Sequence, residues 1–436
     1  MTVRNVALLL ALMPPMTVAR DARAQRREDT SKVCTGERWL PTHELRTRDG
    51  YTVFMERLSI APLRDNVFLA AWPTRTYDSL GKVVWPLAAN GTPSSVEQVP
   101  LGVIVGNDGL ARQVPWPKDI IDGPWLPIAA SDAEGMAHVI WGSQDNVPSS
   151  SLYLVRALWY SRFDGARWTK PARILATEGT VMWNPAQMSP IVVHGHSLHL
   201  VVGVRGEGLR YLRSDGGVWT ERHVNIPKVN MGYPHIAVLS SGRLVLMVQG
   251  NVNPSLAQAI SGFYITRSDD AGDSWSPLTP ITMVDEGPAF DARLLVDERD
   301  VLYAFWYQQT DEAGRPGQGV ALGGSPGRIY ATQSFDKGAT WQRAMPTALI
   351  DNANELQVLM RPNHAVLAVV ADGGGERMLI SMWSDGWSPF TVIDAKPSPF
   401  NPSLGTDDAQ RPFLTWGIRR SQEWLGTGTT TLVPCR

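Results

Sequence analysis

Short apolar runs separated by turn residues recur along the whole chain. The runs end near Trp72, Trp141, Val202, Val248, Trp306, Val370 and Trp416. Several of them are introduced by a proline, at Pro127, Pro234, Pro288 and Pro402. Apolar runs bounded by turn residues indicate β-strands, and a recurrence about every 45 to 75 residues indicates a repeated four-stranded unit. We expect each run to form the innermost strand of its unit.

A polar turn pattern, Ser-x-Asp-x-Gly-x-Ser/Thr-Trp, occurs in full at two places. Its residues are Ser268, Asp270, Gly272, Ser274 and Trp275 in the first copy, and Ser334, Asp336, Gly338, Thr340 and Trp341 in the second. Each copy follows a β-rich run, Phe263 to Thr266 or Ile329 to Thr332. The aspartate supplies side-chain acceptors and the glycine tolerates positive φ, as a tight hairpin requires. The pattern therefore predicts a hairpin with a tryptophan anchor.

This turn pattern is that of the Asp box, or BNR repeat, and through it the chain resembles the sialidase-like β-propellers. The resemblance implies that the motif residues are structural and lie on outer hairpins, away from the ligand site. Degenerate copies occur at Phe163 to Trp168, Ser214 to Trp219 and Ser384 to Trp387, and a weaker one at Asn107 to Gly109, before Trp116. The expected fold is an all-β propeller of four-stranded antiparallel blades.

Both ends of the chain are expected to build one blade. Gly36 to Pro41 reads as a turn and an outer strand, while Pro402 to Ile418 and Thr427 to Pro434 supply the strands that it lacks. This gives seven blades, or six if the stretch that begins at Val53 forms an accessory strand pair. Sialidases have six blades, so a count of seven departs from that family.

The N-terminus has the order of residues of a secretory signal peptide. Arg4 precedes an apolar run from Val6 to Met13, and small residues end at Ala24. We expect residues 1–24 to be removed and 25–436 to form one exported propeller domain. The two cysteines, Cys34 and Cys435, would then pair in an oxidising compartment and join the two ends.

Charge and motif content exclude several classes of function. The formal net charge is -2, which gives no electrostatic reason to bind nucleic acid or an anionic membrane. No later stretch approaches the roughly 18 apolar residues of a membrane span. No phosphate-binding glycine loop or metal-binding sequence motif occurs, so we expect neither a cofactor nor a metal. The expected partner is an acidic carbohydrate.

The resemblance also implies a ligand site at one mouth of the central channel, where a sialidase holds a sugar carboxylate with three arginines. Arg210, Arg328 and Arg377 stand at the start of third strands, and Arg361 lies on or near an inner strand. We expect these residues to bind the substrate; Arg205 and Arg293 are additional candidates. The arginine of the family's Arg-Ile-Pro motif has no match in this chain.

In the same family a tyrosine paired with a glutamate is the nucleophile, and an aspartate transfers the proton. The catalytic candidates here are Tyr307, Glu286 and Asp291, with Tyr233 as an alternative tyrosine and Asp285, Glu355 and Asp145 as further acids. A tyrosine suits an anomeric centre that carries a carboxylate, because a neutral nucleophile avoids charge repulsion. The expected reaction is hydrolysis of a terminal acidic sugar.

Two other functions fit the same fold. A non-catalytic propeller would bind glycan or protein through loop tryptophans, with Trp125, Trp183 and Trp424 as candidates. A uronate lyase would use a histidine or a tyrosine as base and acid. Its candidate histidines are His138, His194, His196, His199 and His235.

Overall fold

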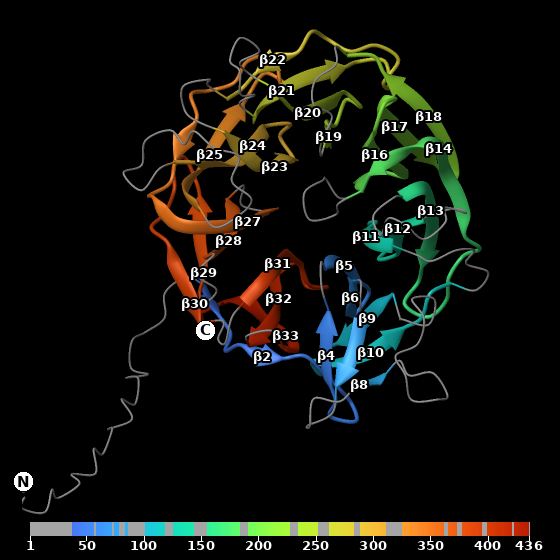
Figure 1. The fold of residues 1–436 in the computed structure, drawn as a ribbon, viewed down its shortest axis with the longest axis vertical. Helices are drawn as coiled ribbons and strands as arrows, with labels where there is room; N and C mark the ends of the chain where they lie inside the picture. The colour runs from blue at the N-terminus through green and yellow to red at the C-terminus, as the bar shows by residue number, and fades with distance from the viewer. Residues whose placement is uncertain are drawn as a thin grey trace, which may run out of the picture. The chain divides into compact units, whose positions relative to one another are not determined.

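The computed structural model describes residues 37–435 apart from 56–57, 72–73, 78–82, 86–100, 118–124, 144–154, 184–190, 227–233, 252–260, 283–287, 311–324, 362–364, 373–376, 395–398 and 421–422. Two compact units divide the chain, residues 1–38 with 434–436, and Trp39–Val433. The second unit carries the sheets (Figure 1). The expected signal peptide, 1–24, lies outside the described residues.

Every regular element in the described residues is a β-strand. One sheet contains β5 (Ser59–Leu63), β6 (Asn66–Ala70), β9 (Gly102–Gly106) and β10 (Leu110–Val114), extended by β3 (Arg46–Thr47), β4 (Thr52–Met55), β7 (Thr74–Tyr77) and β8 (Val83–Trp85). The next contains β11 (Trp125–Ser131), β12 (Ala137–Ser143), β13 (Val155–Phe163) and β14 (Ala172–Met182), joined to β16 (Ser197–Val204), β17 (Gly208–Asp215) and β18 (Val218–Val224), with β15 (Val192–His194) beside β16.

The later strands form three further sheets. One contains β19 (His235–Val238), β20 (Leu244–Asn251), β21 (Ser261–Ser268) and β22 (Thr279–Pro280). Another joins β23 (Ala289–Val296), β24 (Leu302–Gln309), β25 (Ser325–Ser334) and β26 (Met345–Pro346) to β27 (Ile350–Met360), β28 (Val366–Asp372), β29 (Arg377–Trp383) and β30 (Thr391–Asp394). The last contains β31 (Pro399–Thr406), β32 (Pro412–Arg420) and β33 (Glu423–Pro434), with β1 (Glu37–Trp39) and β2 (His43–Glu44) pairing with β33. Four-stranded antiparallel units therefore recur, as the sequence predicts.

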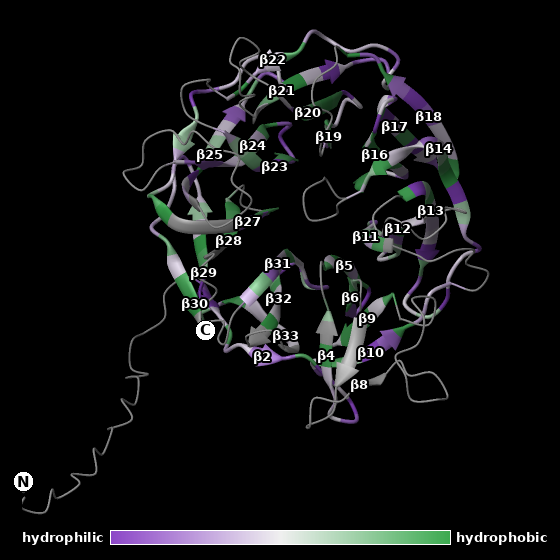
Figure 2. Ribbon diagram, viewed as in Figure 1, coloured by the Kyte–Doolittle hydropathy of each residue, from purple (hydrophilic) through white to green (hydrophobic). Residues whose placement is uncertain are grey.

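The most apolar runs form the second strand of each unit, not the innermost strand as we expected. All residues of β12 are buried, and nearly all of β16 and β24 are too. In Figure 2 the second strands β20 and β28 are mostly hydrophobic, whereas the fourth strand β18 is mostly hydrophilic. A second strand packs on both faces against neighbouring units, so it carries the longest apolar run. First strands such as β23 and β31 line a cavity and keep partly exposed residues.

Hydrophobic clusters join neighbouring units. In one of them, Val245 and Met247 of β20 pack with Leu294 of β23 and Trp306 of β24. The first strands also contact one another in the succession β5, β11, β15, β19, β23, β27 and β31, and β31 contacts β5. The core therefore lies between the sheets, which is the packing of a propeller.

Serine side chains link three of these first strands. Ser59 Oγ of β5 donates to the Ala129 carbonyl of β11 at 3.0 Å and accepts the Ala129 N–H at 2.9 Å. Ser403 Oγ of β31 donates to the Leu58 carbonyl, just before β5, at 2.8 Å. Strands from both ends of the sequence are therefore held side by side.

The two full turn motifs adopt the same hydrogen-bonded hairpin. Ser268 Oγ donates to Asp270 Oδ1 at 2.7 Å and accepts the Gly272 N–H at 2.8 Å. The second copy repeats these bonds, with Ser334 Oγ to Asp336 at 2.9 Å and Gly338 N–H to Ser334 Oγ at 2.9 Å. Asp270 also accepts the Ser274 backbone N–H at 2.9 Å, and Asp336 accepts that of Thr340 at 2.8 Å. Gly272 has φ 92° and Gly338 has φ 83°, which explains the glycine of the motif.

A second repeated turn connects first and second strands in three units. Asp132, Asp297 and Asp407 each accept the backbone N–H groups two and four residues later, at 2.8 to 3.0 Å. The third residue after each aspartate has positive φ: Gly135 at 74°, Asp300 at 64° and Gln410 at 58°. The sequence analysis did not identify this turn.

The residues just after Arg38 pair with the last strand, as we expected. Leu40 N–H donates to the Thr431 carbonyl at 2.9 Å, and His43 lies opposite Thr429. Cys34 lies outside the described residues, so its pairing with Cys435 stays a prediction. Among the described residues no helix is long and apolar enough to cross a membrane.

Candidate functional site

A β-bulge near the start of a first strand forms the basis of the candidate site. The register of β23 with β24 shifts between Phe290 and Arg293, and Asp291, inside this bulge, has φ 46°. The equivalent bulges of β11 and β31 place Leu126 at φ 41° and Asn401 at φ 45°. A left-handed residue other than glycine costs on the order of 1–3 kcal/mol, and such strain is concentrated at functional sites.

The bulge gathers charged side chains around Arg293. Arg293 is 8% exposed, and its Nη1 donates to the Ala292 carbonyl at 2.6 Å. Burial lowers the pKa of the Arg293 guanidinium, while the negative charges of Asp291 and of Glu355 on β27 oppose this shift. A buried cation is tolerated only where opposite charges and hydrogen bonds stabilise it. Two neighbouring first strands therefore place two carboxylates beside one arginine.

Tyr307 comes from the second strand of the same unit. It lies opposite Phe290, is 9% exposed, and packs on the backbone of Gly327 in β25, where an added Cβ would be 2.3 Å from the ring. Burial raises the pKa of the Tyr307 phenol, and the nearby charge of Asp291 raises it further. Tyr307 is therefore protonated at neutral pH, and the charge of Asp291 favours this protonated form.

Arg293 of this cluster borders a cavity among the first strands. A cavity of about 810 Å³ is lined by residues of β5, β11, β23, β27 and β31, among them Arg293 and Gln357. Ligand sites in proteins are usually cavities of about 300–1,000 Å³ with a few polar groups. Arg293 thus connects the charged cluster to a space large enough for a sugar unit.

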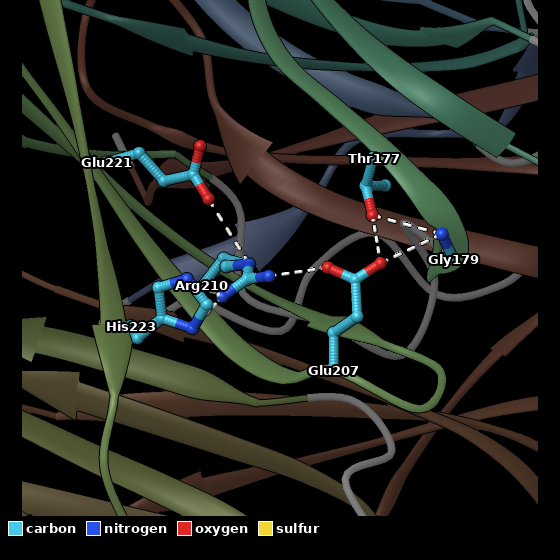
Figure 3. A network of polar contacts seen from close by, with 6 residues as sticks. All are labelled: Thr177, Gly179, Glu207, Arg210, Glu221 and His223. Carbon is cyan, nitrogen blue, oxygen red and sulfur yellow. Dashed lines mark hydrogen bonds and ion pairs between the residues drawn. The ribbon is translucent and has the colours of Figure 1, made fainter.

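Arg210 does not belong to this cluster. Its Nη2 donates to Glu207 at 2.5 Å, its Nε lies 3.2 Å from Glu221, and the guanidinium also contacts His223 (Figure 3). Glu221 and His223 belong to β18, the fourth strand of the unit.

Glu207 in turn joins two units. It accepts the Gly179 N–H of β14 at 2.8 Å and the Thr177 hydroxyl (Figure 3). Arg210 therefore takes part in a polar network on the outer strands where β14 meets the hairpin β16–β17.

The other predicted arginines lie on different strands or at their ends. Arg328 Nη1 donates to the Thr347 carbonyl at 2.8 Å, beside the edge strand β26. Arg361 follows the last residue of β27, in the middle of which Glu355 lies, and its N–H donates to the Ala365 carbonyl. Arg377 begins β29 and is exposed. The grouping of these four arginines around one carboxylate stays a prediction.

Most of the remaining predicted residues lie outside the described residues, and one of them, Trp183, lies in the core. Glu286 and Asp285 lie outside the described residues, as do Tyr233 and Asp145. Trp183 is 8% exposed, and its indole N–H donates to the Leu126 carbonyl at 2.7 Å, so it packs in the core and is no sugar platform. The side chains of Trp125 and Trp424 are not described.

Two of the candidate histidines are buried partners of tyrosines. His138 Nδ1 lies 2.8 Å from the Tyr160 hydroxyl, and His199 Nδ1 lies 2.7 Å from the Tyr211 hydroxyl. Burial lowers the pKa of His199 to about 4, with Arg213 and His194 adding to the shift. Both histidines stand near the start of a second strand, at the end remote from Tyr307. Within the described ranges no group of three or more His, Cys, Asp or Glu residues is placed to hold a metal ion.

The sequence analysis did not recognise Gly327 as part of the site. Its signal was present, because a glycine inside a strand often marks a close approach of another group. Arg293 and Glu355 were secondary candidates, and the structure brings them together with Asp291 and Tyr307.

Comparison with known proteins supports the fold. No protein-family model matches the chain, and no curated protein matches it by sequence. An ulvan lyase of a family of polysaccharide lyases, solved with -[GlcA(1-4)Rha3S]- bound, has a TM-score of 0.51 at 12% identity, over 89% of this chain and 95% of that one. A protein of unknown function from Dyadobacter fermentans has a TM-score of 0.48 at 14% identity, over 92% and 100%.

A mutant of the NanB sialidase from Streptococcus pneumoniae has a TM-score of 0.44 at 10% identity, over 91% of this chain and 98% of that one. At these identities the likeness concerns architecture, and of these three structures the ulvan lyase has a TM-score above 0.5. The chain has the fold of the propeller proteins to which the ulvan lyase belongs.

Proposed function

We propose that this protein is a carbohydrate-active enzyme that acts on an acidic sugar, with Tyr307 as the reacting group. The observation that carries the proposal is that Asp291 acts electrostatically on both Arg293 and Tyr307, and Glu355 acts on Arg293, which itself lines a cavity of about 810 Å³. Arg293 would pair with the sugar carboxylate, because guanidinium and carboxylate form charge-assisted hydrogen bonds.

Hydrolysis of a terminal acidic sugar is the first candidate reaction. Asp291 would accept the phenolic proton while Tyr307 Oη attacks the anomeric carbon and the bond to the leaving group breaks. The electrostatic effect of Asp291 on Tyr307 supports this pairing. Glu286, which lies outside the described residues, would give a proton to the leaving group, and water would then release the sugar from the tyrosine.

Cleavage of a uronate polymer by elimination is the second candidate. Asp291 would take the proton from the carbon beside the uronate carboxylate as the bond to the leaving oxygen breaks. Tyr307, which its raised pKa keeps protonated, would give its proton to that oxygen, and Arg293 would neutralise the uronate. The likeness of the fold to an ulvan lyase favours considering this reaction.

Parallel assays on one purified protein separate these reactions. A fluorogenic sialoside reports hydrolysis, a uronate polymer reports elimination through the ultraviolet absorbance of its unsaturated product, and a neutral glycoside serves as a third substrate. Tyr307→Phe should abolish the activity, whereas Tyr303→Phe, on the same strand, should retain it. Turnover of the neutral glycoside alone would overturn the acidic-sugar assignment, and binding without any turnover would overturn the enzymatic one.

We also propose that Trp39–Val433 forms a closed ring of seven blades in an exported protein. The succession of contacts from β5 through β31 and back to β5 supports this count. The order of residues in 1–24 supports export, and export would allow Cys34 and Cys435 to pair. N-terminal sequencing of the secreted protein and a count of free thiols test these two points.

A further inference from the structure

A small polar cavity of about 150 Å³ lies between the unit of β11 to β14 and the unit of β15 to β18. Its polar lining comprises Asp132, Glu134, His138, Tyr160, Arg162, His196 and Ser214. This volume exceeds the ~10–15 Å³ that one buried water requires. The cavity shares the turn 132–134 with the larger cavity, but neither Arg293 nor Tyr307 lines it.

A shortened turn accounts for this space. The hairpin of β17 and β18 runs from Ser214 to Trp219, two residues fewer than the Asp box from Ser268 to Trp275. In the full box, the aspartate and glycine satisfy the Ser268 hydroxyl, and Gly272 approaches the ring of Tyr211 in the preceding unit. The short turn provides neither group at those positions. Its serine is therefore left facing the cavity.

The Ser214 hydroxyl is buried without a hydrogen-bond partner. Ser214 is 1% exposed, and no described residue lies within hydrogen-bonding distance of its Oγ. A buried hydroxyl with no partner costs about 1–3 kcal/mol, so such groups in native proteins usually meet a water or a ligand.

Arg162 provides a second unpartnered donor on the same wall. Its Nε is buried and has no partner among the described residues. Its positive charge acts on both His138 and Tyr160, which places the guanidinium beside this pair. Donors that carry or adjoin a positive charge select an acceptor, and an anionic oxygen is the strongest one.

One of the two acidic residues of the cavity, Asp132, already accepts hydrogen bonds from neighbouring residues. Asp132 accepts the N–H groups of Glu134 and Met136, both at 2.9 Å, and lies 3.1 Å from His138 Nε2. Glu134 is on the exposed part of the turn. Among the buried side-chain atoms without a described partner, Ser214 Oγ and Arg162 Nε line this cavity, and both can donate a hydrogen bond.

We propose that this cavity binds a small oxyanion of carboxylate, sulfate or phosphate chemistry, held by the Arg162 Nε–H and the Ser214 hydroxyl. The site is independent of the proposed enzymatic function, because the residues that define it belong to other units. A free ion or a charged group on a carbohydrate would satisfy the same two donors.

Isothermal titration calorimetry at constant ionic strength tests the proposal. The probes are inorganic sulfate, inorganic phosphate and glucuronate, with glycerol as a neutral ligand. We expect one saturable site for at least one anion, and an affinity lower by about tenfold or more in Ser214→Ala and in Arg162→Gln. Arg167→Gln, which removes an exposed arginine outside the cavity, should bind as the wild type does. Glucuronate alone would indicate a carbohydrate source, and sulfate or phosphate would indicate the inorganic ion or its ester.

Three results would overturn the site: no saturable binding of any anion, undiminished binding by Arg162→Gln, or equal binding of glycerol. Loss of fold is separable from loss of binding. The Ser214 hydroxyl has no partner among the described residues, so Ser214→Ala should unfold at or above the wild-type temperature while its affinity for the anion falls.

Discussion

At the scale of single residues, two buried serines in equivalent turns differ in their hydrogen-bond partners. Ser268 bonds to Asp270 and Gly272, whereas Ser214 has no partner. Ser268→Ala leaves a buried N–H without an acceptor and should lower the free energy of unfolding by about 1–3 kcal/mol. Ser214→Ala, the matched control, should change it little. Urea unfolding of both variants measures this difference, and equal losses would contradict the role of the motif serine.

The aspartate of the same turn gives a prediction about pH. Hydrogen bonds from Ser274, and then from Ser268, lower the pKa of Asp270 to about 2 from its ordinary value of 3.8. Because the folded state prefers the ionised form, its stabilising effect is complete above pH 3.8 and is lost as the pH falls toward about 2.

Asp270→Asn should therefore lower the Tm at pH 5, and the difference from the wild type should narrow at pH 3. Thermal unfolding at the two pH values measures it, with Asp49→Asn, an exposed turn residue, as control. A difference that widens on acidification would show that the carboxylate is not stabilised by these bonds.

At the scale of elements, the turn between first and second strands repeats as regularly as the Asp box. Asp297 accepts the N–H groups of Arg299 and Val301 and the Tyr303 hydroxyl at 3.2 Å. Although burial raises the pKa of Asp297, these hydrogen bonds lower it by more. The next turn residue, Asp300, accepts both the N–H and the hydroxyl of Ser240, from the preceding unit. This one turn therefore stabilises its own hairpin, β23–β24, and also binds the preceding unit through Ser240.

Removing the acceptor of this turn should destabilise the hairpin. Asp297→Ala leaves the Val301 N–H and the buried Tyr303 hydroxyl without partners, so the free energy of unfolding should fall by about 1–3 kcal/mol. Asp49→Ala is the exposed control. Chemical denaturation checks the effect, and a loss no larger than that of the control would show that water replaces the carboxylate.

The sequence predicted these elements unevenly. Asp boxes were visible because glycine, aspartate and tryptophan occur together at fixed spacing. The Asp297 turn was not, because its left-handed position holds glycine, aspartate or glutamine in different copies. A long apolar run indicates the most buried strand, and we expected that strand to be the innermost one. In the structure burial is greatest in the second strand, so the runs form second strands.

At the scale of the whole molecule, the candidate site could be predicted within one unit but not across units. Asp291, Arg293 and Tyr307 are near one another because paired strands place them there. Arg210 and Arg328 were correctly expected at the start of third strands, but that position does not determine whether a guanidinium faces the cavity or the outer strands. Cross-strand partners decide this, as Glu221 and His223 do for Arg210.

The fold also depends on contacts between its two ends. Thr427 of β33 accepts the buried Met55 N–H through its hydroxyl at 2.9 Å and the Leu45 N–H through its carbonyl at 2.8 Å. Thr427→Val keeps the side-chain volume but removes the acceptor for Met55. The free energy of unfolding should fall by about 1–3 kcal/mol, the cost of a buried donor without a partner.

Thr431→Val, on the same strand, is the matched control. Among the described residues, the Thr431 hydroxyl makes no hydrogen bond to residues 45–55, which Thr427 joins to β33. If unfolding is cooperative over the whole sheet assembly, loss of the Thr427 bond should lower the midpoint of every spectroscopic probe together. Tryptophan fluorescence and far-ultraviolet circular dichroism in urea test this, since the tryptophans are spread over many units. Separate transitions in the variant would instead show that the junction can open while the remaining sheets stay folded.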